Sequence, residues 1–351
     1  MVLVLLLSHL TSKILGSSTV IAGSYVLAFY RGCYYLMDLL KLLCFLISVS
    51  LGVAAKHADL EVYWKSKLPN TPMPKAVRDI IQNGKPPGVG GLSASPQAIP
   101  IRFGRRYFTY GHGVVRDGKN PTEAQLRNHQ NVTVFFLKRD LHWGSIMNLQ
   151  FVNLLDNTAA FLPRQVADSI PFSSKSVPEI LNKFSVNPDS VQAEAIKELI
   201  ADCEEPVIEV EDKYCATSLE SMVDFTTSKL GKNVGAISTE AQKTDPKISK
   251  YVIVDVFKLN DDDKAIVACH KQDYVYAVFY CHTLRRTDAY RVNLVGADDG
   301  AKVKAVVVCH EDTSAWTPKH VAFQLLKVKP GSVPICHFLP EDHFVSWALK
   351  H

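Results

Sequence analysis

The sequence has no excess of charge of one sign. Its 351 residues include 39 Lys and Arg against 35 Asp and Glu, and these are spread without charged blocks. Nucleic-acid-binding domains gather Lys and Arg on one face to neutralise phosphates. No nucleic-acid partner is therefore expected, and the Arg105-Arg106 pair is interpreted as a solvated loop.

Two common local motifs are also missing. No CxxC or HxxxH spacing occurs, although such short offsets normally let one turn supply two ligands to zinc. The glycine-rich run at residues 88–91 follows prolines rather than a strand, and no helix begins after it, so it does not predict a phosphate loop.

What the sequence does contain is the dipeptide Cys-His, four times in its last third. The gaps between successive pairs are 10, 26 and 25 residues. Half of the eight cysteines and a third of the twelve histidines lie in these dipeptides, which makes chance adjacency very improbable. The pairs are Cys269-His270, Cys281-His282, Cys309-His310 and Cys336-His337.

Each pair lies in a run rich in Val, Ile, Tyr and Phe, bounded by Asp, Gly or Pro, as expected of β-strands. The expected strands are residues 264–270, 274–282, 303–310 and 333–338. Adjacent side chains on a strand point to opposite faces. Cys281 is thus expected to share a face with Ala277 and Phe279, and His282 to share the other with Tyr276 and Val278.

If these strands lie side by side, one layer gathers four thiols and the opposite layer gathers four imidazoles. This pattern predicts two disulfides on one side and a histidine-rich metal site on the other. Two alternatives remain. One is a mixed Cys/His zinc site, which the spacing disfavours; the other is histidines that only form hydrogen bonds or lie at the surface.

Secretion would decide whether these cysteines oxidise. Residues 37–55 combine a lysine, an apolar run from Leu42 to Val53 and small residues at the end, which predicts a signal peptide cleaved after Ala55. The run is too short to favour a membrane span. Cleavage would remove Cys33 and Cys44 and leave six cysteines, an even number that suits a disulfide framework.

Residues 1–36 are interpreted as an extension upstream of a functional start at Met37. Their second apolar stretch, Ile14 to Phe29, leaves a membrane helix or an uncleaved anchor as the alternative.

The chain after the signal is long enough for one main domain, residues 131–351, preceded by an N-terminal arm and linker over residues 56–130. The arm is expected to contain a short helix near residues 75–82 and then a Gly-, Pro- and Ser-rich flexible linker. A strand is expected from Val132 to Lys138. Asn131 begins a glycosylation sequon with Val132 and Thr133.

Helical periodicity prevails over residues 160–235. One helix is expected from Val191 to Asp202, and a second after a capping box formed by Thr217 and Glu220, ending at Gly231. Cys203 and Cys215 flank the loop between them and are expected to form a third disulfide. The pattern as a whole predicts an α+β fold with a β-rich antiparallel core, a few helices, disulfide staples and a flexible N-terminal arm.

The four-pair signature resembles that of the plant BURP domain. Other segments agree, among them residues 135–142, 213–222 and 333–340, and residues 63–74 resemble the dehydration-responsive and unknown-seed-protein subgroup. The resemblance covers nearly everything after Met37.

The resemblance implies a secreted plant protein of the cell wall, apoplast or a storage compartment such as the vacuole, linked to stress response or seed development. Some BURP proteins are copper-dependent peptide cyclases that crosslink a Tyr or Trp side chain to an unactivated carbon. By position, His270, His282, His310 and His337 become candidate copper ligands, and Cys269, Cys281, Cys309 and Cys336 become disulfide partners. His142, His320 and His343 could complete or orient such a site, or could be ordinary histidines.

The linker lacks the features of a built-in peptide substrate for such a cyclase, because it contains no repeated motif, no Gln-Pro and no Trp. The nearest candidate for such a core peptide is Ile99 to Tyr110, which carries Phe103 and Tyr107. Two hypotheses follow. The first is a copper-dependent cyclase or crosslinker acting on a peptide in trans or in cis. The second is a non-catalytic wall or storage protein, with a cell-wall polymer as the alternative partner.

Overall fold

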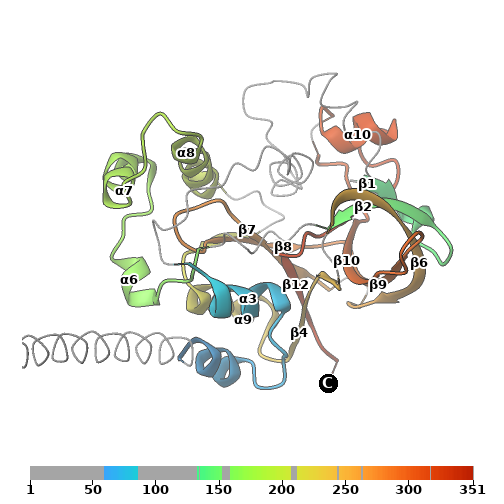
Figure 1. Ribbon diagram of the computed structural model, residues 1–351, viewed down its shortest axis with the longest axis horizontal. Helices are drawn as coiled ribbons and strands as arrows, with labels where there is room; N and C mark the ends of the chain where they lie inside the picture. Colours follow the sequence, from blue (N-terminus) through green and yellow to red (C-terminus); the bar gives the residue numbers. More distant parts are fainter. Residues whose placement is uncertain are drawn as a thin grey trace, which may run out of the picture. The chain divides into compact units, whose positions relative to one another are not determined.

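The computed structural model divides the chain into two compact units, Met1–Asp59 and Leu60–His351. The structure describes residues 59–85, 133, 135–151, 159–206, 212–242, 245–261, 264–316 and 318–350. The expectations for the extension at 1–36, the signal peptide at 37–55, the linker, the segment 99–110 and the Asn131 sequon lie outside these residues. Everything below concerns the second unit (Figure 1).

Two antiparallel sheets form the core of this unit, and this confirms the predicted β-rich α+β fold. The larger sheet has the order β1 (Phe135–Leu137), β11 (Ile335–Phe338), β10 (Lys302–His310), β9 (Thr287–Gly296), β6 (Asp245–Lys258) and β2 (Ile146–Phe151), and β5 (Glu240–Ala241) pairs with β10. The smaller sheet has the order β3 (Lys213–Ala216), β8 (Phe279–Leu284), β7 (Ile266–Lys271), β12 (Phe344–Ala348) and β4 (Val234–Ser238).

Alternation along the strands sorts side chains into three apolar layers. On β10, Val306 and Val308 join a cluster that takes residues from both sheets, including Ala268 of β7 and Val345 of β12. The alternate residues of β10 pack instead with β2, β6 and β9 on the other face of the larger sheet. The face of the smaller sheet away from the shared cluster packs against α3 and α9. Each sheet is therefore covered on both faces.

The larger sheet curves strongly, as the ring of β2, β6, β9 and β10 shows (Figure 1). Thr133, just before β1, donates its backbone N–H to the carbonyl of Asn148 on β2 at 2.7 Å. The first and last strands in the order are thereby linked through this residue.

The helices lie mainly before the Cys-His strands, as predicted. Besides the helical residues 60–67, the described part of the chain has α3 (Lys75–Asn83), α6 (Arg164–Asp168), α7 (Val177–Lys183), α8 (Val191–Glu204) and α9 (Leu219–Leu230), with α10 (Val321–Leu326) between β10 and β11, and two 3₁₀ turns, η1 (Lys138–Asp140) and η2 (Ser174–Ser176). The helix expected at 191–202 is confirmed. Its N-cap is Ser190, whose hydroxyl accepts a hydrogen bond from the Ala193 N–H at 3.1 Å.

The predicted capping box of α9 is wrong by one residue. Ser218, not Thr217, is the N-cap, and its partner is Ser221, not Glu220. Ser and Thr are both good N-caps, so a Thr-Ser dipeptide leaves the position ambiguous until packing fixes it. The predicted end at Gly231 is confirmed, and its φ of 80° explains why glycine suits that position.

The strand predicted at 274–282 begins only at Phe279. Tyr274, Tyr276 and Val278 lie before it and pack into a third core with α7 and α8. A buried apolar loop and a buried strand have the same composition, which is why the sequence did not separate them.

The N-terminal part of the second unit is built into the core. Residues 60–67 are helical, and Trp64, Leu68 and Ile80 are buried against α9 and the smaller sheet. The Thr71 hydroxyl donates to the Val234 carbonyl at 2.6 Å, and the Ala76 N–H donates to the Ser238 hydroxyl at 3.1 Å. Over these residues the expected arm is an integral layer of the domain.

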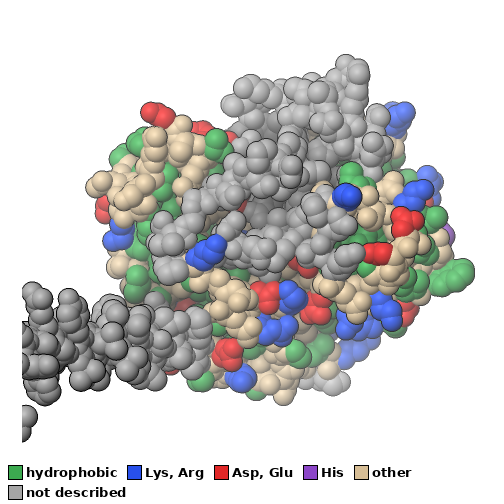
Figure 2. All heavy atoms as spheres, in the orientation of Figure 1, with side chains coloured by type: hydrophobic (Ala, Val, Ile, Leu, Met, Phe, Trp, Pro, Cys, Tyr) green, Lys and Arg blue, Asp and Glu red, His purple; other side chains and the backbone are tan. Residues whose placement is uncertain are grey.

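Within the described part of the chain, no helix combines the length and the hydropathy needed to cross a bilayer. On the face shown in Figure 2, Lys and Arg side chains lie among Asp and Glu side chains.

Candidate metal centre

The two disulfides of the Cys-His pairs join residues that face each other on neighbouring antiparallel strands. Cys269 on β7 is opposite Cys281 on β8, and Cys309 on β10 is opposite Cys336 on β11. Their Cα atoms are 4.1 and 4.0 Å apart, and both bonds are formed. Such short separations are typical of positions where paired strands approach most closely.

This register fixes where the histidines lie. Each histidine follows its cysteine by one residue, so it projects from the opposite face of the sheet. His270 faces Tyr280 across the ladder, and His282 faces Ala268, which makes the two histidines diagonal neighbours. His310 and His337 are related in the same way on the other sheet. Diagonal positions are within reach for long or aromatic side chains.

The expectation of four thiols in one layer is not met, because the four strands do not lie side by side. The β7/β8 pair belongs to the smaller sheet and the β10/β11 pair to the larger one. The two disulfides therefore lie in different apolar layers, one beside α9 and one inside the curve of the larger sheet. The four histidines do gather, because they project into the space that the two sheets share.

All four histidines line a single pocket between the sheets, and each is at most 6% exposed. His270 Nε2 is 3.1 Å from His282 Nε2, and His310 Nε2 is 3.4 Å from His337 Nε2. Each sheet thus contributes one close pair of imidazoles. Apolar side chains, including Ala268, Leu284, Val308 and Leu339, complete the wall.

Burial keeps two of these imidazoles, those of His270 and His337, in their neutral form. It lowers the pKa of His337 from 6.5 to about 3. Burial also lowers the pKa of His270 well below its usual value, and repulsion from His343, His282, His337 and His310 lowers it further. Neutral imidazole is the form that binds metals.

Aromatic rings form a second layer around the histidines. The centroid of the Trp316 ring lies 4.9 Å from the ring centroid of His310 and 4.5 Å from that of His320. Phe135 contacts His337 and His320 edge-on, and Tyr280 lies 5.6 Å from His282. Oxidisable side chains, one indole and one phenol, therefore lie directly against the imidazoles.

The three other candidate histidines have different surroundings. His343 is 1% exposed, and its Nδ1 is 2.9 Å from Nδ1 of His270. His320 lines the pocket, but its Nδ1 accepts a hydrogen bond from the Ala322 N–H at the start of α10. His142 is exposed and contacts the Trp143 carbonyl, so it takes no part in this site.

The donor set suits a metal ion that prefers imidazole. Two nitrogens bound to one ion at about 2.0–2.1 Å with tetrahedral angles lie roughly 3.3 Å apart. The separations within the two pairs, 3.1 and 3.4 Å, bracket this value. No three His, Cys, Asp or Glu side chains of the described residues are, however, arranged to hold one ion together. The nitrogens of each histidine pair are thus spaced to bind one ion together. A site with three or four histidine ligands requires rotation of the side chains.

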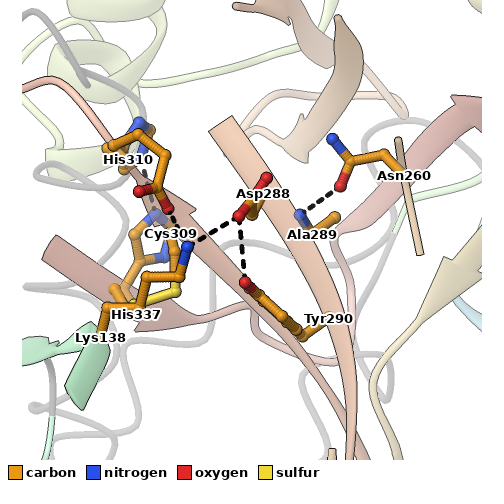
Figure 3. The surroundings of a disulfide bond; sticks show 10 residues. Lys138, Asn260, Asp288, Ala289, Tyr290, Cys309, His310 and His337 are labelled. Carbon is orange, nitrogen blue, oxygen red and sulfur yellow. Dashed lines mark hydrogen bonds and ion pairs between the residues drawn. A yellow bond between two sulfur atoms is a disulfide. The ribbon is translucent and has the colours of Figure 1, made fainter. Parts of the chain in front are cut away.

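A charged network around Lys138 and Asp288 lies near the disulfide of Cys309 (Figure 3). The Lys138 ammonium contacts Asp288 at 2.8 Å and Glu311 at 2.6 Å, and Asp288 also accepts from the Tyr290 hydroxyl and from Lys258. Burial would raise the pKa of Asp288, but its hydrogen bonds to the two lysines lower it. The network lies on the disulfide face, so it supports the strand that carries Phe135 without entering the histidine pocket.

The third disulfide joins Cys203, in the last turn of α8, to Cys215 on β3. Unlike the four completely buried cysteines, these two are partly exposed. All six cysteines of the second unit are therefore disulfide-bonded, and none is left as a thiol ligand.

A model of the BURP domain matches residues 134–348 of this chain. The chain belongs to the BURP-domain family. The match contains all four Cys-His pairs, and it begins well after Leu60, where the packed unit starts.

Similar curated proteins come from several plants. BURP domain-containing protein 3 of Oryza sativa subsp. japonica is 48% identical over 253 residues, 71% of this chain and 57% of that protein. BURP domain protein RD22 of Arabidopsis thaliana is 47% identical over 71% of this chain and 62% of its own length. The chain thus spans about three fifths of these two relatives. BURP domain-containing protein 5 of rice is 41% identical over 90% of this chain and 96% of its length.

The sequence did not single out Trp316, Phe135 or Asp342, which surround the histidines. Trp316 lies in a segment with no motif of its own, and Phe135 was noted only as part of the segment 135–142 that resembles the family. Asp342 had a signal, since it adjoins His343, but only the fold shows that its side chain is buried.

Proposed function

We propose that this BURP-domain protein is secreted and binds copper through His270, His282, His310 and His337, and that the loaded protein crosslinks a peptide oxidatively in cis or in trans. The observation that carries the proposal is the placement of four buried imidazoles in one pocket whose neighbouring cysteines are all oxidised. Imidazole suits copper, and competing thiolates are absent from the six described cysteines.

The disulfides support secretion. Disulfides persist in oxidising compartments such as the secretory pathway and are rare in the cytosol. Three disulfides in one unit therefore favour passage through that pathway, toward the apoplast, the cell wall or the vacuole.

The chain's own residues would hold the copper ion, shield the histidines from water and orient the imidazole rings. Bound copper would supply one-electron chemistry with dioxygen. Joining a phenol or indole to an unactivated carbon removes two hydrogen atoms, which dioxygen takes up as hydrogen peroxide. The aliphatic wall excludes water from the histidines, and Trp316 and Phe135 hold the imidazole rings in place.

The position of β1 is compatible with a substrate in cis. Phe135 lines the pocket, and Tyr110 precedes it by 25 residues in the sequence. Covalent linkage over so few residues would keep such a segment at high local concentration.

A second function is favoured by one observation. The histidines are at most 6% exposed, and no three of them within the described residues already form a metal site. A non-catalytic wall or storage protein, in which the histidines are part of the core, would have this arrangement. Such a protein would fold and localise normally without metal.

Copper content tests the proposal first. The full chain would be secreted from plant cells and purified without chelators or metal-affinity tags. We expect near-stoichiometric copper in the wild type and in His142→Ala, whose histidine is exposed, and at least tenfold less in His282→Ala and His310→Ala. A folded, disulfide-bonded wild type that takes up no copper when it is added would contradict the proposal and favour the non-catalytic protein.

A further inference from the structure

His343 and Asp342 lie behind the histidine pocket in a buried line of contacts. His270 presents one nitrogen to each side: its Nε2 is 3.1 Å from His282, and its Nδ1 is 2.9 Å from Nδ1 of His343. The other nitrogen of His343, Nε2, is 3.5 Å from Oδ1 of Asp342. Asp342 and His343 are 0% and 1% exposed.

The contact between the two Nδ1 atoms requires one proton. Two imidazole nitrogens at 2.9 Å form a hydrogen bond only if one carries hydrogen and the other accepts. There are two arrangements, with the proton on His270 or on His343. The choice decides which nitrogen of His270 keeps its lone pair.

Asp342 favours one of these arrangements. If His270 carries the Nδ1 proton, neutral His343 carries its own proton on Nε2, facing the carboxylate. If His343 carries the Nδ1 proton, its Nε2 lone pair faces the carboxylate oxygen. At 3.5 Å this contact is longer than a good hydrogen bond, so its effect is electrostatic, but burial makes it strong.

We infer that His343, backed by Asp342, is a positioning residue that holds His270 in its Nδ1–H tautomer, so that the Nε2 lone pair of His270 points into the pocket toward His282. The arrangement resembles in principle the carboxylate and histidine partners that orient metal-binding imidazoles. His343 is then not itself a ligand, because its Nδ1 accepts from His270 and its Nε2 carries a proton.

The inference rests on the proposed function for its purpose, but the tautomer can be measured in protein without metal. Histidine-selective ¹⁵N labelling and long-range ¹H–¹⁵N spectra distinguish the two neutral tautomers. The His270 signals are assigned by their loss in His270→Gln. We expect His270 in the Nδ1–H form in the wild type; an Nε2–H form would overturn the inference without any further variant.

Two matched substitutions separate positioning from simple packing. In His343→Asn the amide occupies the place of Nδ1 and can still accept from His270. In His343→Gln the amide occupies the place of Nε2 and keeps only the contact with Asp342. We expect His343→Asn to retain the Nδ1–H form and His343→Gln to lose it. Equal behaviour of the two variants would show a merely structural role and overturn the inference.

Copper affinity gives the second readout. We expect His343→Gln to bind copper 10- to 100-fold more weakly than wild type, the usual effect of losing an orienting partner, and His343→Asn to stay within a few-fold. If wild-type His270 is in the Nδ1–H form but the protein binds no copper, the proposed function is contradicted while the positioning role of His343 is still supported. Asp342→Asn, which removes the charge, should lower the Nδ1–H population of His270; an unchanged population would remove Asp342 from the inference.

Discussion

A cysteine and a histidine that are neighbours on a β-strand must project from opposite faces of the sheet. In this protein that rule places each thiol in an apolar layer, where it is oxidised, and each imidazole in the pocket between the sheets. The dipeptide therefore separates two chemistries that would compete if both side chains faced one ion. Each cysteine and each histidine therefore pairs with the same kind of residue on the neighbouring strand, not with its neighbour in the sequence.

The buried histidines should make the metal-free protein sensitive to acid. The unfolded chain binds a proton at His337 near its usual pKa of 6.5, whereas burial lowers the pKa in the folded protein to about 3. Below pH 6.5 the unfolded state binds more protons, so the stability that depends on neutral His337 is present above pH 6.5 and is lost as pH falls toward 3. The slope approaches about 1.4 kcal/mol per pH unit for one such group.

His337→Gln should therefore show a shallower fall in unfolding free energy between pH 6.5 and 4 than wild type, measured by urea denaturation. Burial raises the pKa of Glu341 to about 7, so this group makes the unfolding free energy rise as pH falls. Glu341 is present in both proteins, so it does not affect the difference between their slopes. His142→Gln, at an exposed position, should keep the wild-type slope. Equal slopes in His337→Gln and wild type would contradict the prediction.

At the scale of elements, the three disulfides have different surroundings. Two staple strand pairs whose cysteines are completely buried, β7 with β8 and β10 with β11. The third joins the end of α8 to the edge strand β3, where both cysteines are partly exposed. Disulfide exchange requires a thiolate to reach a sulfur atom, so access sets the rate in the native state.

We expect mild dithiothreitol to reduce Cys203–Cys215 at least about tenfold faster than the two strand staples. Trapping with an alkylating reagent and mass spectrometry of the cysteine peptides would measure the order. In denaturant, where access is equal, the three bonds should react at similar rates. Earlier reduction of Cys269–Cys281 or Cys309–Cys336 in the native protein would show that the strand pairs open more readily than their burial implies.

At the scale of the whole second unit, the packed domain is larger than the part that the family model matches. The match begins at residue 134, whereas the unit begins at Leu60 and includes α3 and the helical residues 60–67. These elements cover the face of the smaller sheet that contains Cys269 and Cys281. They form the outer wall of the sheet that contributes His270 and His282 to the pocket.

Trp64→Ala should lower the unfolding free energy by about 3–5 kcal/mol, as large-to-small changes in a core do. The indole is 3% exposed, and its Nε1 donates to the Thr71 carbonyl at 2.8 Å. Val62→Ala, on the same helical segment but 63% exposed, is the matched control and should change stability by at most about 0.5 kcal/mol. Similar small effects of both changes, measured by urea denaturation, would show that this segment is not part of the core.

Local rules predicted the elements with the strongest patterns. One helix begins at Val191 and another ends at Gly231 as expected, and Val306 and Val308 lie on the opposite face from Cys309 as strand alternation requires. Local rules failed where two conformations have the same composition. The segment from Tyr274 to Val278 has the residues of a strand but packs as a buried loop.

The sequence by itself determined the family, the antiparallel β-rich class and the separation of each cysteine from its histidine, because these depend on spacing and on the two-residue period of a strand. Only the tertiary structure decided that the strands belong to two sheets, that both pairs of imidazoles meet in one pocket and that His343 and Asp342 lie behind His270. Alternation states which side of its own sheet a residue faces. Which sheets pack together depends on contacts between residues far apart in the chain, and no local pattern contains them.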